Sequence, residues 1–294
     1  MNGFVKEYAG ANCQIYQMKL RIKLCQLILL AGFAATGAQL QLAGSPEPEF
    51  FFSGNARAVP VVFSNPTERD FRGEIRTCIY QTSSATTVIL SDAPWKEVSV
   101  PANETFLDAA ALDFPVVKAK TRFLIQWLEE TNQVIGTTSV LIYPTNLLEL
   151  LPPLKKDDFG VFDPNDQLKP LLKAERVPFV DLGEMELAHF TGKLAIIGPF
   201  ATKAQVPEDL AKQILATAKH NVAVVWIQPP RDENDLLQPS FYSVQKSRTA
   251  VLVAQAEMVP DLAENPRSQL NLIYFCQQAL YPQPTVLPDL TQQP

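Results

Sequence analysis

The sequence predicts two domains: an N-terminal all-β sandwich of the immunoglobulin-like kind and a C-terminal α/β domain. Three observations lead to this fold class. The chain has 294 residues, a length that suits two domains of ordinary size. Short strand-like runs separated by turns fill residues 47–145, whereas strand-like and helix-like runs alternate over residues 158–280. Residues 146–157 lie between them and contain Pro152 and Pro153, so this segment is predicted to be a stiff linker.

The N-terminal segment has the features of a secretory signal. Basic residues precede an apolar run over residues 24–35, and small residues at 36–38 suit cleavage. We therefore expect residues 1–38 to be a signal peptide, with Met18 as the start, and the mature protein to be periplasmic or secreted. The apolar run is shorter than the about 20 residues of a typical membrane span, so an uncleaved anchor is the alternative rather than the first choice.

Charge and cysteine content restrict the classes of partner. The net charge of the chain is −6, and cleavage after residue 38 would make it more acidic, because that segment is basic. An acidic protein is repelled by nucleic acid and by anionic membranes. We expect no nucleic-acid partner and no membrane insertion beyond the signal segment. Cys78 and Cys276 have apolar neighbours and are predicted to be buried free thiols, although export would permit a disulfide.

The first domain is predicted from alternating apolar and polar residues. Residues 71–80 alternate with the period of a strand that has one face in water. Residues 122–128 and 134–142 flank Glu130–Asn132, which predicts a β-hairpin. Six or seven such strands in about a hundred residues are typical of a β-sandwich. Further short strands are expected at residues 49–52, 58–63 and 95–100.

This strand pattern resembles the bacterial immunoglobulin-like modules that precede catalytic or binding domains in exported proteins. The resemblance covers about a third of the chain and implies a module that places or supports the domain after it. The aromatic residues Phe50–Phe52, Trp95 and Trp127 are expected to pack in or around the sandwich core, which is rich in aromatic residues in this fold. A surface on which these rings stack against a sugar is the alternative.

The second domain is predicted from β–α alternation. Leu194–Ile197 is a buried run typical of a strand covered on both faces. Pro178 places the second strand of the domain at an edge of the sheet. We therefore expect a five-stranded, mostly parallel sheet with right-handed crossovers and the flavodoxin-like strand order 2-1-3-4-5. The expected strands are residues 159–162, 177–180, 194–197, 221–227 and 249–254, and helices are expected to end near Lys173 and to span 206–219 and 265–280.

This half of the chain resembles the class I glutamine amidotransferase-like fold, in the degenerate form that follows immunoglobulin-like modules in exported bacterial proteins. The residues that carry the resemblance are 159–164, 193–200, 221–228, 251–255 and 265–270. Active members of that family have a Gly-x-Cys-x-Gly elbow after the third strand and a later histidine. This chain has Gly198–Thr202 at the elbow, without a cysteine, and no histidine after His220. The resemblance therefore implies no catalytic residue.

Ligands of open α/β sheets bind beyond the carboxyl ends of the strands. The candidate ligand-binding residues are those predicted at these ends: Asp163, Asn165, Gly198, Thr202, Gln228 and Arg231. Helix capping is the alternative role for Asp163 and Asn165. No metal or other cofactor is expected, because His189 and His220 lack ligand partners at metal-site spacing and no glycine-rich nucleotide motif is present.

These observations favour an exported, non-catalytic binding or assembly protein of the cell envelope, with a protein or a polysaccharide as partner. The alternative is a hydrolase that uses a strand-end carboxylate such as Asp163, or one of the serines of the 240–247 loop, which are Ser240, Ser243 and Ser247. The Pro-rich tail, residues 281–294, is predicted to be extended or disordered.

Overall fold

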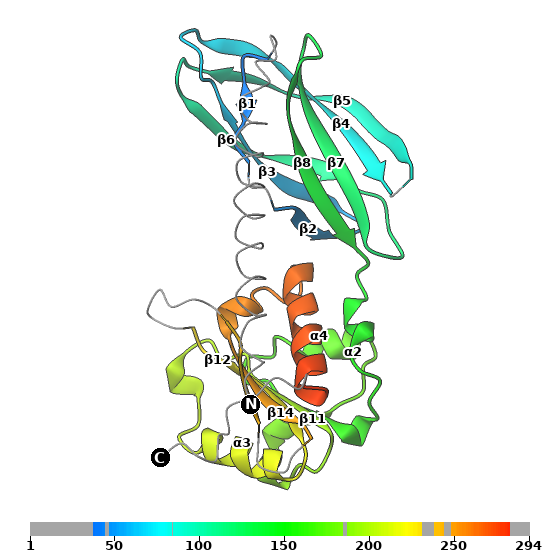
Figure 1. Cartoon of the computed structure of the whole chain (residues 1–294), viewed down its shortest axis with the longest axis vertical. Coiled ribbons are helices and arrows are strands. Elements are labelled where there is room, and N and C mark those ends of the chain that lie inside the picture. Colours follow the sequence, from blue (N-terminus) through cyan, green and yellow to red (C-terminus); the bar gives the residue numbers. More distant parts are fainter. Residues whose placement is uncertain are drawn as a thin grey trace, which may run out of the picture.

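The computed structural model describes residues 38–44, 47–83, 85–184, 187–230, 238–243 and 248–282. These residues form three β-sheets and three α-helices (Figure 1). Several predictions lie outside the described residues: all but the last residue of the signal segment 1–38, the start at Met18, the site residue Arg231, and the tail from residue 283 onward. They stay predictions.

The N-terminal half consists of two sheets that pack face to face as a β-sandwich (Figure 1). The three-stranded sheet is antiparallel, and the five-stranded sheet is antiparallel except where β2 runs parallel to β8. The strands of the three-stranded sheet are, in order, β1 (Gln41–Leu42), β3 (Ala56–Ser64) and β6 (Thr105–Asp113). Those of the five-stranded sheet are β2 (Glu49–Phe52), β8 (Val134–Tyr143), β7 (Thr121–Glu129), β4 (Phe71–Thr82) and β5 (Thr87–Val100).

The sandwich core is built on aromatic side chains that point inward from both sheets. Phe63 and Trp127 are fully buried, and their rings meet edge to face with centroids 5.7 Å apart. Trp95 packs on Trp127 at 5.3 Å. The indole Nε1 of Trp127 donates a hydrogen bond to Thr138 Oγ1 at 2.9 Å, so its polar group is satisfied inside the core. The interpretation of Trp127 as a core residue is confirmed.

Strand β6 is absent from the sequence-based prediction. Its segment contains three successive alanines and no β-branched residue after Thr105, so its composition does not indicate a strand. Nevertheless, all nine of its residues pair with β3 in an antiparallel ladder. Long-range pairing therefore outweighs the local preference of this segment.

The C-terminal half contains a six-stranded mixed sheet. Five of its strands, in the order β10-β9-β11-β12-β14, are mutually parallel, and the last strand, β13, runs antiparallel to β14. In sheet order, the bounds are β10 (Val180–Asp181), β9 (Phe159–Phe162), β11 (Leu194–Ile197), β12 (Ala223–Gln228), β14 (Ala250–Gln255) and β13 (Ser240–Ser243).

The predicted fold class is therefore wrong. The described chain is mostly β, with three sheets and few helices, and its C-terminal sheet has six strands of mixed direction instead of five strands in a flavodoxin-like fold. The added strand, β13, is a four-residue segment with a serine at each end, which no apolar run marks in the sequence. It is a strand because its backbone pairs with β14. Among the described residues, no α-helix connects β12 to β14.

Three α-helices surround this sheet: α2 (Lys169–Ala174), α3 (Leu210–Lys219) and α4 (Pro266–Leu280). Helix α4 begins after Asn265, whose side chain accepts a hydrogen bond from the backbone N–H of Arg267. Alternate residues of the strands pack with α4 and with α3, so the two helices cover opposite faces. The predicted helix over residues 265–280 is thus confirmed.

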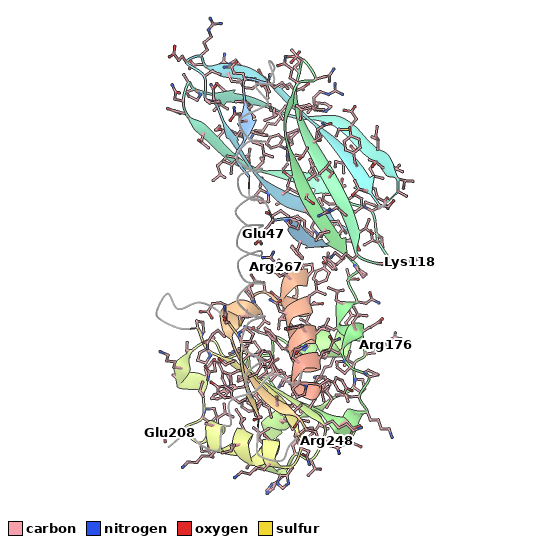
Figure 2. The ribbon with its side chains drawn as sticks, viewed as in Figure 1. Glu47, Lys118, Arg176, Glu208, Arg248 and Arg267 are labelled. Carbon is pink, nitrogen blue, oxygen red and sulfur yellow. The ribbon has the colours of Figure 1, made fainter. Side chains whose placement is uncertain are left out.

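One hydrophobic cluster spans the junction of the two halves, beside the separate core of the sandwich. Phe52 and Tyr143 at the lower end of the sandwich pack in the same cluster as Leu147 and Leu148 of a short 3₁₀ turn, Leu147–Leu150, and as the buried face of α4. Arg267 at the start of α4 lies 4.5 Å from the centre of the Phe50 ring and 2.8 Å from Glu47 Oε2. Figure 2 shows Glu47 and Arg267 between the sandwich and α4. The boundaries 47–145, 146–157 and 158–280 remain predictions.

Both cysteines of the described chain are buried and free, Cys78 in the sandwich and Cys276 in α4. The prediction of two buried thiols is confirmed. Burial raises the pKa of the Cys276 thiol far above its ordinary value, so this sulfur stays protonated and unreactive.

Candidate functional site

The first predicted site residue, Asp163, follows β9 and caps helix α2. Its carboxylate is buried, and Oδ2 accepts hydrogen bonds from the backbone N–H groups of Leu168 at 2.7 Å and Lys169 at 2.9 Å. These donors lie at the start of α2, where backbone N–H groups lack partners within the helix. The other oxygen, Oδ1, is buried and has no hydrogen-bond partner among the described residues. Capping accounts for the presence of an acid at this position.

Asn165 lies in a network of amides that joins the ends of β9 and β11. Its Nδ2 donates to the carbonyl of Pro199 at 3.0 Å, and its Oδ1 accepts from Gln205 Nε2 at 2.8 Å. Gln205 Oε1 in turn accepts from the N–H of Ala201 at 2.8 Å. Gln205 was not among the predicted residues. The network uses the polar groups of Asn165 to hold the loop after β11.

Gly198 and Thr202 lie in that same loop. Gly198 has a φ of +97°, and a Cβ atom at this position would meet the carbonyl oxygen of Ile227 in the neighbouring strand. A glycine is therefore required where β11 ends close to β12. Thr202 is exposed, and its side chain makes no capping hydrogen bond to the 3₁₀ turn Lys203–Gln205 that follows it. Gly198 is thus explained by the path of the backbone, and Thr202 lies in an exposed part of the same loop.

An ion-pair cluster joins α2 to the end of β10. Lys169 Nζ lies 3.1 Å from Asp166 Oδ1 and 3.2 Å from Asp181 Oδ2. Burial disfavours the charged ammonium, but the hydrogen bonds and charges of the two carboxylates outweigh burial and raise the pKa of Lys169. Burial also disfavours ionised Asp181, yet the Gly183 N–H and the Lys169 ammonium lower its pKa. Both groups keep their charges near neutral pH, which is unfavourable for proton transfer.

A cavity of about 340 Å³ lies between α3 and the face of β12, β14 and β13; we call it the α3 cavity. None of the described residues that line it carries a charge. The lining residues are Ala211, Ile214, Leu215, Trp226, Gln228, Gln238, Ser240, Tyr242, Val251, Val253 and Gln255.

The register of the strands explains how these side chains come together. Val253 of β14 lies between Trp226 of β12 and Ser240 of β13. Gln228 is paired with Gln255 at the carboxyl ends of their strands, and Gln255 Nε2 donates to Gln228 Oε1 at 3.0 Å. An α-helix is about 10 Å across and covers about two strands, since strands lie about 4.8 Å apart. Helix α3 packs on β12, so the face over β14 and β13 is left partly open.

One polar group of the cavity wall is unsatisfied. The indole Nε1 of Trp226 is buried and has no hydrogen-bond partner among the described residues. Its cross-strand neighbours, Ile197 and Val253, are apolar and supply no acceptor. A buried donor without a partner costs about 1–3 kcal/mol. The described lining of the cavity combines apolar side chains with hydroxyl and amide groups, a mixture that small-molecule sites also have.

The sequence analysis found only part of this site. Of the six predicted residues, Gln228 lines the α3 cavity, whereas Asp163, Asn165, Gly198 and Thr202 are absent from its lining and Arg231 is outside the described residues. Trp226 was missed as a site residue. A signal was present, because Trp226 and Gln228 are two positions apart in one strand and so share a face. Of the candidate serines, Ser240 lines the cavity, Ser243 ends β13, and Ser247 lies outside the described residues.

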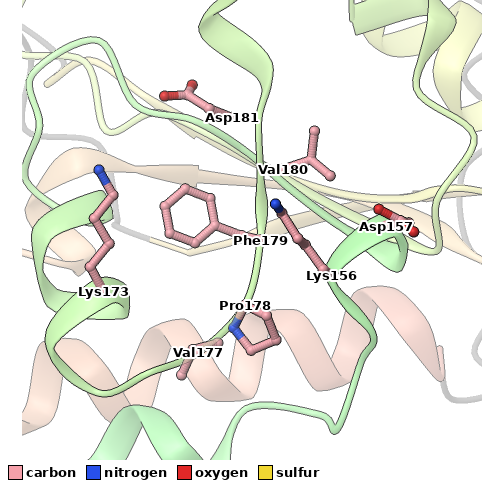
Figure 3. A pocket seen from close by; sticks show the side chains of 8 residues that line it. All are labelled: Lys156, Asp157, Lys173, Val177, Pro178, Phe179, Val180 and Asp181. Carbon is pink, nitrogen blue, oxygen red and sulfur yellow. The ribbon is translucent and has the colours of Figure 1, made fainter.

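A second pocket, of about 720 Å³, lies along the edge strand β10 (Figure 3). Figure 3 shows Phe179 extending on the side of Lys173, with Lys156 and Asp157 on the other side of the segment. Two lysines and two aspartates line this pocket, so it has no uniform charge, and it contains none of the six predicted residues. We therefore regard the α3 cavity as the candidate site.

Other classes of site find no support within the described ranges. No group of three or more His, Cys, Asp or Glu side chains there is arranged to hold a metal ion. Neither His189 nor His220 lines the α3 cavity. No helix in the described part of the chain has the length and apolar character needed to cross a bilayer.

No family model and no curated protein matches the chain. Solved structures that share similarity include the Pseudomonas fluorescens alkylpurine DNA glycosylase AlkC bound to DNA, with 12% identity, a TM-score of 0.30, and coverage of 39% of this chain and 33% of that one. A Listeria innocua β-glucosidase in complex with laminaribiose has 13% identity and a TM-score of 0.27, and the match covers 36% of this chain and 16% of that one. An Acinetobacter baumannii CsuC–CsuE chaperone–tip adhesion subunit complex has 10% identity and a TM-score of 0.27, and the match covers 46% of this chain and 66% of that one.

This chain thus spans a third of the glycosylase and 16% of the glucosidase. TM-scores of this size carry no argument about fold or function. The resemblances to immunoglobulin-like modules and to the glutamine amidotransferase-like fold stay predictions.

Proposed function

We propose that this protein is a non-catalytic binding protein that holds a small uncharged ligand in the α3 cavity. The observation that carries the proposal is the α3 cavity itself, a space of about 340 Å³ whose described lining combines aliphatic side chains with hydroxyl and amide groups. The absence of charged side chains from the described lining favours a neutral ligand, because a charge would lose its hydration without gaining a partner.

The surroundings of the reactive residue types support binding rather than turnover. The Asp163 carboxylate accepts two backbone hydrogen bonds as a helix cap. Lys169 and Asp181 hold each other in their charged forms. Ser240 lines the cavity, but activation of a serine requires a base within hydrogen-bond reach, and neither histidine of the chain belongs to the lining.

The proposal places the protein in the cell envelope, exported by the signal-like segment at residues 1–38. The sandwich and the C-terminal sheet share a core around Tyr143 and Leu148, which supports a rigid body that presents the cavity at a defined distance from the sandwich. Assembly with a further protein or with a polysaccharide is part of the same proposal.

Ligand binding is tested by thermal unfolding of the protein in the presence of a collection of small neutral molecules. A ligand at about 100-fold over its Kd stabilises the folded state by about 2.7 kcal/mol. Val253 lies at the centre of the cavity floor, so Val253→Phe fills the site and should abolish the stabilisation. Val134→Phe is the control, because Val134 is exposed in the sandwich. A ligand that stabilises the Val253→Phe variant as much as the wild type would show that the α3 cavity is not its site.

A hydrolase is the second candidate, because Ser240 lies in the cavity wall. A fluorophosphonate probe for reactive serines separates the two candidates. Labelling that is lost in Ser240→Ala, together with turnover of an ester or amide substrate, would replace the binding proposal by a hydrolase. We expect neither labelling nor turnover.

A further inference from the structure

The five-stranded sheet of the sandwich ends in a long strand whose first half is exposed. Strand β5 is the last in the order β2-β8-β7-β4-β5, so only its side toward β4 is paired within the sheet. Figure 1 shows β5 along the outer rim of the sandwich. Every residue from 87 to 92 is exposed. Three successive residues there, Val88, Ile89 and Leu90, are large and apolar, and 56%, 61% and 42% of their surfaces are accessible to water.

An unpaired strand edge is usually protected by charge, by proline or by shortness, because its free N–H and C=O groups otherwise pair with another strand. The other edge strands of the described sheets have such protection. Strands β1, β2, β10 and β13 have two to four residues, and β6 contains Asp108 and Asp113. Within β5, the second half contains Pro94, Lys96 and Glu97. No charged residue and no proline occurs from residue 83 to residue 91, so the first half of β5 is a long edge without protection.

This exposed run is apolar on both faces of the sheet. Val88 is paired with Gln81 and Ile89 with Tyr80, so the side chains of Val88 and Ile89 lie on opposite faces. Leu90 lines a pocket of about 530 Å³ between β4, β5 and β6. A strand that continues the sheet covers both faces at once, whereas a globular surface laid against one face leaves the other in water.

The same strand of a second molecule has the chemistry that this edge requires. It is extended, uncharged over the same residues and carries the same free backbone groups. In an antiparallel register centred on Ile89, Val88 of each copy stands opposite Leu90 of the other. Asp92 stands opposite Thr86, so no two like charges face each other in the pair, although each chain has a net charge of −6. A twofold pair uses the same patch on both molecules and therefore closes as a dimer.

We infer that the protein forms a twofold homodimer in which residues 86–92 of two copies pair antiparallel and join two five-stranded sheets into one continuous sheet. This inference goes beyond the proposed function and does not depend on it, because the α3 cavity lies in the other half of the chain. One strand pair is a small interface, so we expect a dissociation constant of about 1–100 μM.

The experiment is sedimentation equilibrium of the full-length protein from about 1 to about 200 μM. The wild type should pass from one chain to twice the mass of one chain. Ile89→Lys should weaken dimerisation at least about tenfold, because both copies lose an apolar contact and place an ammonium group opposite its like. Leu107→Lys is the matched control, since it makes the same change at a residue of β6 that is 74% exposed, and should leave dimerisation unchanged.

Hydrogen exchange of the wild type tests the pairing without any variant. Backbone N–H groups of residues 87–91 that point away from β4 should exchange more slowly at about 200 μM than at about 1 μM, because they gain hydrogen bonds only in the dimer. The N–H groups of β6 should exchange at the same rate at both concentrations.

Each further outcome overturns the inference. A wild type that stays monomeric does so, as does a dimer that Ile89→Lys leaves intact or that gives β5 no added protection. Growth beyond two copies would show open-ended association instead of a closed pair. If the wild type is monomeric but a synthetic peptide with the sequence of residues 86–92 slows exchange in β5, the edge binds a foreign strand and a second copy is not its occupant.

Discussion

The sheets of the sandwich and the sheet of the C-terminal half are covered in different ways. In the sandwich, two sheets cover each other, and the rings of Phe63, Trp95 and Trp127 fill the middle of the space between them, while a pocket of about 530 Å³ opens between β4, β5 and β6. In the C-terminal half, α4 covers one face, while α3 covers only part of the other and leaves a cavity of about 340 Å³. Both halves thus leave space, between two sheets in the sandwich and between a sheet and a helix in the C-terminal half.

Two tryptophans show the same contrast at the level of one hydrogen bond. Trp127 donates to Thr138, which lies on the adjacent strand β8. Trp226 also lies in a strand, but its cross-strand neighbours, Ile197 and Val253, are apolar, and its Nε1 has no partner in the part of the chain that the structure describes. The indole beside a hydroxyl has its hydrogen bond inside the core, whereas the indole between aliphatic neighbours is buried without an acceptor among the described residues.

The largest effect is expected in the sandwich core. Trp127 is fully buried, so Trp127→Ala should lower the free energy of unfolding by about 3–5 kcal/mol. Urea denaturation followed by circular dichroism measures this loss. A loss below about 1 kcal/mol would contradict the description of the sandwich core, because the core around Trp127 would then not be tightly packed.

The next effect concerns the loop at the carboxyl end of β11. Gly198→Ala should destabilise the protein by about 2–3 kcal/mol, because φ is +97° and the new methyl group meets the Ile227 carbonyl. Gly44→Ala is the control, since a Cβ atom there makes only ordinary contacts. Thermal unfolding of the two variants measures the difference, and equal stability would show that the close approach of β11 to β12 is relieved at no cost.

A third variant sharpens the contrast between the two indoles. Thr138→Val leaves Trp127 Nε1 unpaired in the core, as Trp226 Nε1 is in the cavity wall. The expected loss is about 1–3 kcal/mol by urea denaturation. Thr137→Val, at an exposed neighbouring position, is the control and should change stability little. If both variants were equally stable, the hydrogen bond of Trp127 would not distinguish it from Trp226.

The contact between the halves should contribute less. Arg267→Ala removes the contact with the Phe50 ring and the ion pair with Glu47, and the expected loss is about 0.5–1 kcal/mol, because these groups are largely exposed. The part due to the ion pair should shrink in high salt. Lys118→Ala serves as an exposed control. A loss of several kcal/mol would show that the halves are joined mainly through this contact rather than through their shared core.

The smallest effect is a pH dependence at the edge of the C-terminal sheet. The folded state lowers the pKa of Asp181 below its ordinary value of 3.8, through the Gly183 N–H and Lys169, although burial opposes this shift. The ionised carboxylate therefore stabilises the fold above pH 3.8, and this stabilisation is lost as the pH falls through the lowered pKa. Asp181→Asn should be less stable than the wild type by less than about 1 kcal/mol at pH 7, since the pair is partly exposed. Chemical denaturation from pH 7 to pH 2 measures whether this difference disappears in acid, and a constant difference would contradict the assignment.

The extent of sequence-based prediction differs between elements for a physical reason. Leu194–Ile197 was predicted because a strand buried on both faces is a continuous apolar run in the sequence. Pro266–Leu280 was predicted because a capping residue precedes an amphipathic pattern. Strands β6 and β13 were missed because their segments acquire strand structure by pairing with β3 and β14. For the same reason, the number and direction of strands in the C-terminal sheet were predicted incorrectly.

The candidate site shows the same division. By itself, the sequence determined that Gln228 follows a buried run of apolar residues, that Trp127 has a core setting and that no cysteine nucleophile follows β11. Only the tertiary structure decided that Asp163 caps a helix, that Ser240 comes beside Val253, and that Trp226 Nε1 is buried without a partner among the described residues. The periodicity of apolar residues along a sequence indicates which face of a helix or strand a residue occupies. The residues opposite that face come from distant segments, and their arrangement depends on sheet order and helix placement.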